Sequence, residues 1–279
     1  MIKLACMTLP YAKFSFERAL EGISRAGYRY IAFGHPHEGR EYPEENNPES
    51  IFSVQALFAK YGLQPILLAS NAYFKIDQPL ERAIKRLQAA KALGVKEILT
   101  VGTQSYRKFP SDPLSEEEMK PLNEAFVERY KRIADEAAAL DLVVTVKPHT
   151  GNTATAAHLR RTLEQIGSPH VQVSYDPGNV QFYEGIAAHT DLPGIADRTY
   201  SLIAKDHRGA QANLDFPIPG TGDVDFPSIL ATMKQAEFSG SVIVERVDGP
   251  AEPEQIDQRI SESREHVERM LKEAGFELG

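Results

Sequence analysis

Four stretches in the second half of the chain carry side chains that can bind a metal ion or move protons. Each follows a short apolar run, and they are Lys147-Pro148-His149, Asp176-Pro177-Gly178-Asn179, Lys205-Asp206-His207-Arg208 and Glu245-Arg246. Alternate residues of a strand face the same side, so Lys147 and His149 share a face, as do Lys205 and His207. Imidazoles and carboxylates that converge can hold Mn²⁺, Mg²⁺, Co²⁺ or Zn²⁺. Such a cation beside a general base would stabilise an enediolate.

Each stretch also has a simpler explanation when it is taken alone. Asp-Pro-Gly-Asn is good turn chemistry, and Lys-Asp-His-Arg is typical of a solvated loop. His35 and His37 flank a proline after an earlier apolar run, and they fit substrate contact and an exposed loop equally well. Consecutive apolar runs that all end in ligand-capable groups are harder to explain in this way. We therefore predict one shared site.

The elements that must position these groups are eight strands alternating with helices. Most of the apolar runs are continuous, which is typical of parallel strands buried on both faces. Helical spacing of apolar residues is clearest over Leu80–Leu93, Leu122–Leu140 and Ser261–Lys272, whereas Gly185, Pro193 and Gly194 interrupt it after the sixth strand. The predicted strands are Ile2–Met7, Tyr30–Phe33, Pro65–Ala69, Glu97–Val101, Leu142–Lys147, Val171–Tyr175, Tyr200–Lys205 and Ser241–Glu245.

This alternation over 279 residues predicts an α/β fold, a (β/α)8 TIM barrel that forms a single domain over residues 1–279. A doubly wound open sheet is the alternative. It usually has a glycine-rich loop after its first strand, and Met7-Thr8-Leu9-Pro10-Tyr11 is no such loop. Active sites of TIM barrels lie where the strands end, and the four polar stretches fall at those positions.

Composition limits the partners of the protein. No apolar run approaches the roughly 18 residues that span a bilayer. The net charge of −8 disfavours the attraction to phosphates on which nucleic-acid binders rely. Cys6 is the single cysteine, which excludes a disulfide framework and fits a reducing cytoplasm. We expect a cytoplasmic protein with no membrane or nucleic-acid partner. Formation of a homo-oligomer is compatible with the sequence.

The second half of the chain resembles the sugar phosphate isomerase/epimerase family of xylose isomerase-like TIM barrels. That family also contains ketose 3-epimerases, inosose dehydratases, hydroxypyruvate isomerases and apurinic-site endonucleases. The Pro-Gly-x-Gly-x-Val-Asp-Phe run is the most specific motif, and the first half of the chain agrees only in its strand–helix pattern. The matching motifs lie in the expected order at Val143–Gly151, Ser174–Asn179, Ile203–His207, Pro219–Phe226 and Phe238–Glu245.

The resemblance implies metal ligands at the ends of four strands: a Glu on strand five, an Asp on strand six, a His on strand seven and a Glu on strand eight. The last three correspond to Asp176, His207 and Glu245, but Lys147 stands in the first position. Asn179 stands near a position where many members have a histidine, and the strand-two acid is missing.

A lysine at a ligand position opposes metal binding, because an ammonium group repels a cation and cannot ligate it. We favour His149 as the fourth ligand, which leaves Lys147 as an acid or base. Alternatively, Lys147 replaces the positive charge of the metal by pairing with Asp176 and Glu245 in a metal-free site. A third alternative is a barrel that binds sugar without turnover.

The resemblance implies a sugar or keto-sugar isomerase or epimerase that removes a proton α to a carbonyl. We expect Glu245 to be the base, Lys147 the acid or second base, and a divalent cation held by His149, Asp176, His207 and Glu245. A β-eliminating lyase or dehydratase is an alternative. An apurinic-site endonuclease is a remote one, because it needs further ligands and a basic surface. The residues expected to contact the carbohydrate substrate are His35, His37, Asn179, Lys205 and Arg208.

Overall fold

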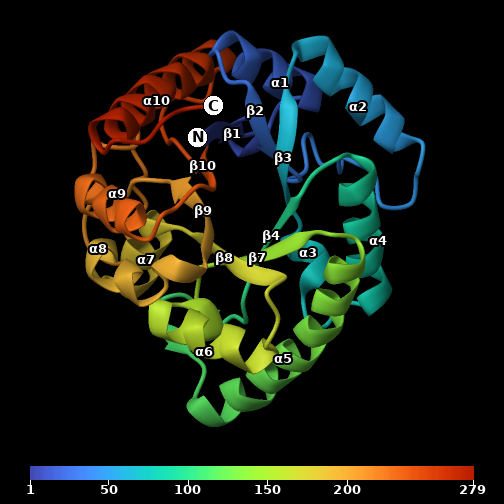
Figure 1. The fold of residues 1–279 in the computed structure, drawn as a ribbon, viewed down its shortest axis with the longest axis vertical. Coiled ribbons are helices and arrows are strands. Elements are labelled where there is room, and N and C mark those ends of the chain that lie inside the picture. Colours follow the sequence, from blue (N-terminus) through green and yellow to red (C-terminus); the bar gives the residue numbers. More distant parts are fainter.

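The computed structural model describes residues 1–279 and contains a closed barrel of eight parallel strands surrounded by helices (Figure 1). The sequence order of the strands is also their order around the barrel, and the last strand pairs with the first to close it. The predicted fold class is therefore confirmed, and every predicted strand is found within one residue at each end. The strands are β1 (Lys3–Met7), β2 (Tyr30–Phe33), β3 (Gln64–Ala69), β4 (Glu97–Val101), β7 (Val143–Lys147), β8 (Val171–Tyr175), β9 (Thr199–Ala204) and β10 (Ser241–Val244).

Two helices begin earlier than their apolar spacing predicts. The predicted helix Leu122–Leu140 starts at Glu116, where Ser115 and Glu118 form a capping box, and it accommodates Pro121 near its start. The last helix starts at Pro253 rather than Ser261, with the proline in its first turn. The helices are α1 (Phe16–Arg25), α2 (Ser50–Tyr61), α3 (Asn71–Phe74), α4 (Leu80–Ala92), α5 (Glu116–Ala139), α6 (Ala156–Ile166), α7 (Pro177–Glu184), α8 (Ala188–Asp191), α9 (Phe226–Gln235) and α10 (Pro253–Glu273).

Two apolar clusters stabilise the barrel. The larger one joins 60 buried residues, mainly between the strands and the helices that surround them. The smaller one has ten buried residues, all on strands, and includes the small side chains Ala5, Ala32 and Ala69 inside the barrel. Side chains of this size leave room in the interior for the longer polar groups that point inward from other strands.

A buried carboxyl group, Glu97 at the start of β4, lies in the barrel interior. Its hydrogen-bond partners are the hydroxyl groups of two strand residues. Thr145 Oγ1 donates to Glu97 Oε1 over 2.8 Å, and Ser201 Oγ donates to the same oxygen over 2.6 Å. Because alternate strand residues share a face, Lys147 points inward two positions after Thr145. The polar residues of the barrel interior thus lead up to the strand ends.

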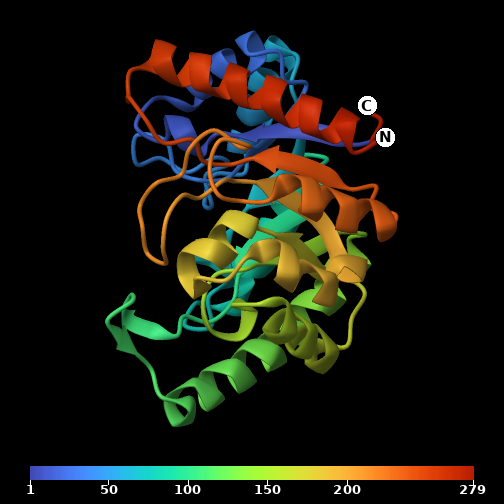
Figure 2. The same ribbon diagram turned by 90° about the vertical axis from the view of Figure 1, so that its left-hand side faces the viewer.

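Two segments project beyond the strand ends on the same side of the barrel (Figure 2). One is a short antiparallel hairpin of β5 (Tyr106–Lys108) and β6 (Asp112–Pro113), which continues into α5. The other is the connection between β9 and α9, residues 205–225. The barrel mouth between them is therefore the part of the fold that loops can cover. None of the helices has the length and apolar character needed to cross a membrane.

Candidate active site at the barrel mouth

Two lysines and two carboxylates form a ring of ion pairs at the ends of β7, β8, β9 and β10. We call Lys147, Asp176, Lys205 and Glu245 the mouth ring. Lys147 Nζ lies 2.5 Å from Glu245 Oε2 and 3.2 Å from Asp176 Oδ2. Lys205 Nζ lies 3.2 Å from the same Asp176 oxygen and 3.4 Å from Glu245 Oε1. Each lysine thus contacts both carboxylates, and the two positive and two negative charges cancel.

All four side chains of the mouth ring are at most 8% exposed, so their charges are sustained by one another rather than by water. Burial alone would lower the pKa of Lys147, but the attraction of Glu245 and Asp176 outweighs it and raises this pKa above its ordinary value. Burial would likewise raise the pKa of Glu245, but Lys147 and Lys205 together hold it far below its ordinary range. Lys147 and Glu245 are therefore both ionised at neutral pH.

The turn after β8 positions two parts of the site at once. Asp176 caps α7 by accepting a hydrogen bond from the Asn179 main-chain N–H over 2.9 Å. The Asn179 amide accepts a hydrogen bond from Lys205 Nζ over 2.5 Å and donates one to the Pro148 carbonyl over 2.7 Å. A Cβ atom on Gly178 would lie 2.7 Å from the Lys205 carbonyl oxygen, so glycine is required there. Asp-Pro-Gly-Asn therefore forms the predicted turn, and its Asp176 and Asn179 also contact Lys205; their role in a site stays a prediction.

Neither histidine predicted as a metal ligand joins the mouth ring. The His207 ring packs between Phe182 and Phe216, and its Nε2 atom lies 2.8 Å from the Asn213 carbonyl oxygen. The other ring nitrogen of His207 is buried without a partner. His149 Nε2 lies 2.8 Å from the Tyr183 hydroxyl. Burial, followed by the charge of Lys147, lowers the pKa of His149 to about 4, so this imidazole is neutral at physiological pH.

The donor atoms at the mouth do not fit a divalent cation. His149, Asp176, His207 and Glu245 do not converge, and no three His, Cys, Asp or Glu side chains approach one another closely enough to hold an ion. Asp176 and Glu245 are paired with ammonium groups, which would repel a cation placed between them. The unpartnered nitrogen of His207 supplies one donor, and a stable site needs three or four.

The other predicted substrate contacts divide into two groups. His35 is half-buried beside the ring, and burial, opposed by the charge of Glu245, lowers its pKa. The structure does not bring His37 to the mouth: its Nδ1 atom lies 3.1 Å from two carbonyl oxygens, those of Tyr11 and Phe14, and the ring is 1% exposed. Arg208 is exposed and braces its own loop, where it donates to Asp215 and to the Thr221 carbonyl.

Asp206, which the sequence predicts only as part of a loop, holds the connection after β9 in position. Its buried carboxylate accepts hydrogen bonds from four main-chain N–H groups, those of His207, Gly220, Gly222 and Val224, over 2.8–3.1 Å. A Cβ atom on Gly222 would lie 2.4 Å from Asp206 Oδ1, which explains the second glycine of the Pro-Gly-x-Gly motif. Asp206 thereby fastens both ends of the loop to the strand that carries Lys205.

A group of aromatic side chains beside the mouth ring was not predicted from the sequence. We call Phe109, Phe182, Tyr183 and Phe216 the aromatic rim. Phe109, at the turn of the β5–β6 hairpin, packs against Phe182 and Tyr183 of α7 with ring centroids 5.4 and 5.1 Å away. The centroid of the Phe216 ring lies 5.3 Å from Lys205 Nζ, and the ammonium group is over the face of the ring. Phe182 and Tyr183 could have indicated this group, because they follow closely after the Asp-Pro-Gly-Asn turn in the sequence. Charged groups bordered by aromatic faces are typical of pockets for small polar ligands.

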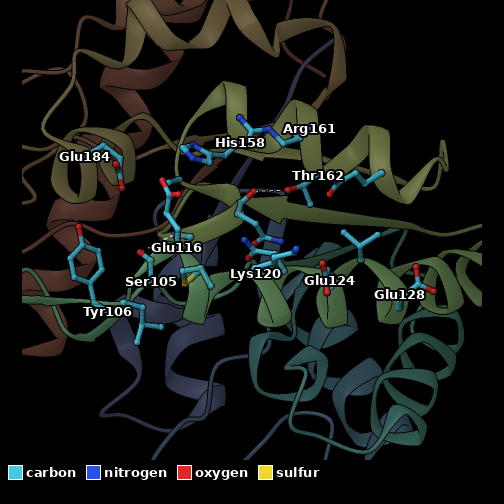
Figure 3. Close-up of a pocket in the computed structure, with 18 of the residues that line it drawn as sticks. Ser105, Tyr106, Glu116, Lys120, Glu124, Glu128, His158, Arg161, Thr162 and Glu184 are labelled. Atoms are coloured by element: carbon cyan, nitrogen blue, oxygen red, sulfur yellow. Dashed lines mark hydrogen bonds between the residues drawn. The ribbon is translucent and has the colours of Figure 1, made fainter.

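A large cavity of about 1020 Å³ lies outside the barrel, between α5 and α6. Figure 3 shows Lys120 and Glu124 of α5 on one wall and His158 and Arg161 of α6 on the other. Its lining carries charges of both signs, and none of the mouth ring residues belongs to it. The convergent ion pairs therefore place the candidate active site at the mouth rather than in this cavity.

Comparisons with known proteins agree with the fold and with the motifs. A family model described as a xylose isomerase-like TIM barrel matches residues 20–273. The chain is 25% identical to an L-ribulose 3-epimerase from Methylomonas sp. (strain DH-1), over 82% of this chain and 77% of that protein. It is 21% identical to an inosose dehydratase from Lacticaseibacillus casei, over 85% of this chain and 84% of that protein.

Solved structures show the same barrel. The D-allulose 3-epimerase from Methylomonas sp. in complex with D-allulose matches with a TM-score of 0.73 at 19% identity, over 96% of this chain and 97% of that one. The IolI protein with a bound zinc atom matches with a TM-score of 0.75 at 16% identity, over 97% of this chain and 99% of that one. At these identities, the matches establish the fold.

Proposed function

Because this chain belongs to the xylose isomerase-like TIM barrel family, as its motifs predict, we propose that it is an enzyme that isomerises or epimerises a sugar or keto-sugar. The proposed reaction begins with removal of the proton next to a carbonyl group. The observation that carries the proposal is Glu245, an ionised, buried carboxylate held between two ammonium groups at the barrel mouth. The similarity to an L-ribulose 3-epimerase supports the same class of reaction.

Glu245 is the proposed base and Lys147 the proposed acid. A carboxylate with a low pKa is a weak base, so it removes a carbon-bound proton only if the resulting anion is stabilised in the same step. Lys147 is in direct contact with Glu245 Oε2 and belongs to β7, whereas Glu245 follows β10. The two groups come from different strands but meet at one point, so Lys147 can deliver a proton to the carbonyl oxygen or to the neighbouring carbon while Glu245 holds the proton that it removed.

The substrate class proposed is a polyhydroxylated carbonyl compound. The half-buried side chains of His35 and Tyr183 offer hydrogen-bonding groups beside the mouth ring. The amide of Asn179 and the ammonium group of Lys205 offer two more. Phe109 offers an aromatic face to the C–H side of a sugar. Metal assistance, which the sequence predicted with His149 as a ligand, is not part of the proposal, because the donor set does not fit a cation.

A β-eliminating dehydratase is the second candidate. The similarity to an inosose dehydratase supports it, and removal of the same proton is its first step. The difference comes afterwards, when a neighbouring hydroxyl leaves as water instead of a proton being returned. Lys147 is again the proposed acid. The products separate the two reactions, because only elimination changes the mass of the substrate.

The test is proton exchange with solvent. The protein is incubated in D₂O with ketopentoses, ketohexoses and inososes, and deuterium at the carbon next to the carbonyl is followed by NMR. We expect exchange with at least one substrate, and Glu245→Gln should slow it by about 10²–10⁴-fold, the usual contribution of a general base. Glu265→Gln, at an exposed position of α10, is the matched control and should leave the rate unchanged. Equal rates for Glu245→Gln and the control would disprove the role of Glu245.

A further inference from the structure

We propose that the ammonium groups of Lys147 and Lys205 together stabilise the oxyanion of the reaction, and that the enzyme works without a divalent cation. This inference rests on the proposed function, because the oxyanion arises only when a proton is removed next to a carbonyl. Lys205 thereby becomes a catalytic residue rather than one that merely binds the substrate.

The two ammonium groups occupy the centre of the mouth ring. Both lie 3.2 Å from one oxygen of Asp176, so their separation is no more than twice this distance. Each also contacts a different oxygen of Glu245. A substrate oxygen that enters the ring therefore meets two positive charges, each held by a strand end. Fixed charges in a buried site stabilise a developing negative charge better than mobile water does.

Lys205 is held in place from sides other than the substrate side. Asn179 Oδ1 accepts its shortest hydrogen bond, at 2.5 Å, and the Phe216 ring lies beneath the ammonium group. Its contact with Glu245 is the longest of its polar contacts, at 3.4 Å. A substrate oxygen can replace this contact while the other partners continue to hold Lys205.

The charges of the ring match the proposed step. At rest, two ammonium groups and two carboxylates give no net charge. When Glu245 takes the proton, the C–H bond breaks, its electron pair forms the new C=C bond, and the carbonyl π pair moves onto oxygen. Glu245 is then neutral, and the ring carries one positive charge beside one negative oxygen. Electroneutrality is kept throughout, so no external cation is needed.

A bound dication would break this balance. Placed among the four groups, it would give the resting ring a net charge of +2 in a buried site and lie near both ammonium groups. The Coulomb energy of like charges at such distances is several times larger in a protein interior than in water. The same geometry that stabilises an oxyanion thus excludes a metal ion.

The first experiment measures metal binding directly. Protein purified without chelator is analysed for bound metal, and its melting temperature is recorded with Mg²⁺, Mn²⁺, Co²⁺ and Zn²⁺. We expect less than 0.1 equivalent of metal, on the order of a contaminant, and no cation-specific rise in melting temperature. Deuterium exchange should change less than about twofold after dialysis against EDTA. One equivalent of a tightly bound metal, or exchange lost on chelation and restored by one cation, would overturn the inference.

Lysine variants test the role of the charges. Lys205→Met should slow exchange by about 10²–10³-fold with a smaller change in KM, as loss of an oxyanion-stabilising group does, and Lys205→Arg should recover part of the rate. Lys91→Met, at an exposed position of α4, is the matched control. If Lys205→Met does not fold, the exchange rate of Lys205→Arg is compared with that of the wild type. A lower rate in Lys205→Arg would show that the reaction depends on where the positive charge is held, and an unchanged rate would count against the inference. An unchanged rate in folded Lys205→Met would refute the inference.

The two proposals fail in different ways. If the proposed function is wrong, no substrate exchanges its proton with or without added metal. If only this inference is wrong, exchange occurs but depends on a metal that the protein binds. Lys147→Met gives a readout independent of activity, because it leaves two carboxylates with one ammonium group. This variant should melt at a lower temperature than the wild type, because a buried carboxylate loses its closest partner, and Mn²⁺ should stabilise neither protein, because two carboxylates are fewer donors than a cation site needs; stabilisation of the wild type by Mn²⁺ would overturn the inference.

Discussion

Replacing Glu97 by glutamine is expected to increase the free energy of unfolding at pH 8 by about 3 kcal/mol relative to the same replacement at pH 4.5. Glu97 is 2% exposed in the barrel interior, and its partners are the hydroxyls of Thr145 and Ser201. Burial raises its pKa from the ordinary 4.5 to about 7, and the two hydroxyls offset this only in part. At about 1.36 kcal/mol per pKa unit, the rise corresponds to the figure given.

The sign follows from which state binds the proton more tightly. The folded protein, with the raised pKa, keeps Glu97 protonated between pH 4.5 and about 7, where the unfolded chain has released the proton. The free energy of unfolding therefore falls as the pH rises through this window. A glutamine cannot ionise, and its carbonyl oxygen can accept the same two hydrogen bonds. The variant should lack this part of the pH dependence.

The assay is urea unfolding followed by circular dichroism at several pH values from 4.5 to 8. The quantity tested is the variant-minus-wild-type difference in unfolding free energy, because titration of other groups cancels in it. Glu265→Gln is the control, since its exposed side chain gives no reason for a pH-dependent difference. A Glu97→Gln difference that stays constant from pH 4.5 to 8 would refute the reasoning and would mean that Glu97 is solvated or paired in the folded state.

Three further predictions concern the mouth. Asp206→Ala leaves four main-chain N–H groups without their acceptor, so it should lower the unfolding free energy by at least about 3 kcal/mol in urea titrations; a change below 1 kcal/mol, roughly one ordinary hydrogen bond, would contradict this. Phe109→Ala should raise KM several-fold with little change in melting temperature, and an unchanged KM would remove the aromatic rim from the substrate site. His149→Asn should change the rate but not the shape of the pH–rate profile between pH 5 and 8, because the pKa of His149 is already lowered to about 4. Loss of a titration in that range would show that His149 is charged in the working enzyme.

The strands and the four mouth ring residues were predictable from the sequence for one physical reason. Parallel strands buried on both faces read as continuous apolar runs, so their ends are sharply marked. Lys147 is the last residue of β7, and Asp176, Lys205 and Glu245 each follow their strand directly. At these positions the sheet still dictates where a side chain points.

The histidines show where this reasoning stops. His149 lies two residues beyond β7 and His207 three residues beyond β9, where the chain has left the sheet and alternation no longer applies. The partner of His149 is Tyr183 of α7, and the partner of His207 is the carbonyl of Asn213, six residues further along the same connection; no local pattern reveals either contact. His37 is held by two carbonyl groups from the segment after β1 for the same reason. Contacts of this kind depend on tertiary packing.

The loop anchored by Asp206 divides the mouth into a part that is fixed and a part that can be exchanged. Asp206 binds main-chain N–H groups, so at its contacts the anchor constrains only the glycines at positions 220 and 222, the first by its positive φ and the second by its close approach to the carboxylate. The tip at residues 209–214 lies between Arg208 and Asp215, which close it by their own ion pair. Grafting a different tip there would alter what reaches the mouth while Lys205, one residue before the anchor, keeps its place. The barrel thus offers a modular position for redesigning substrate range.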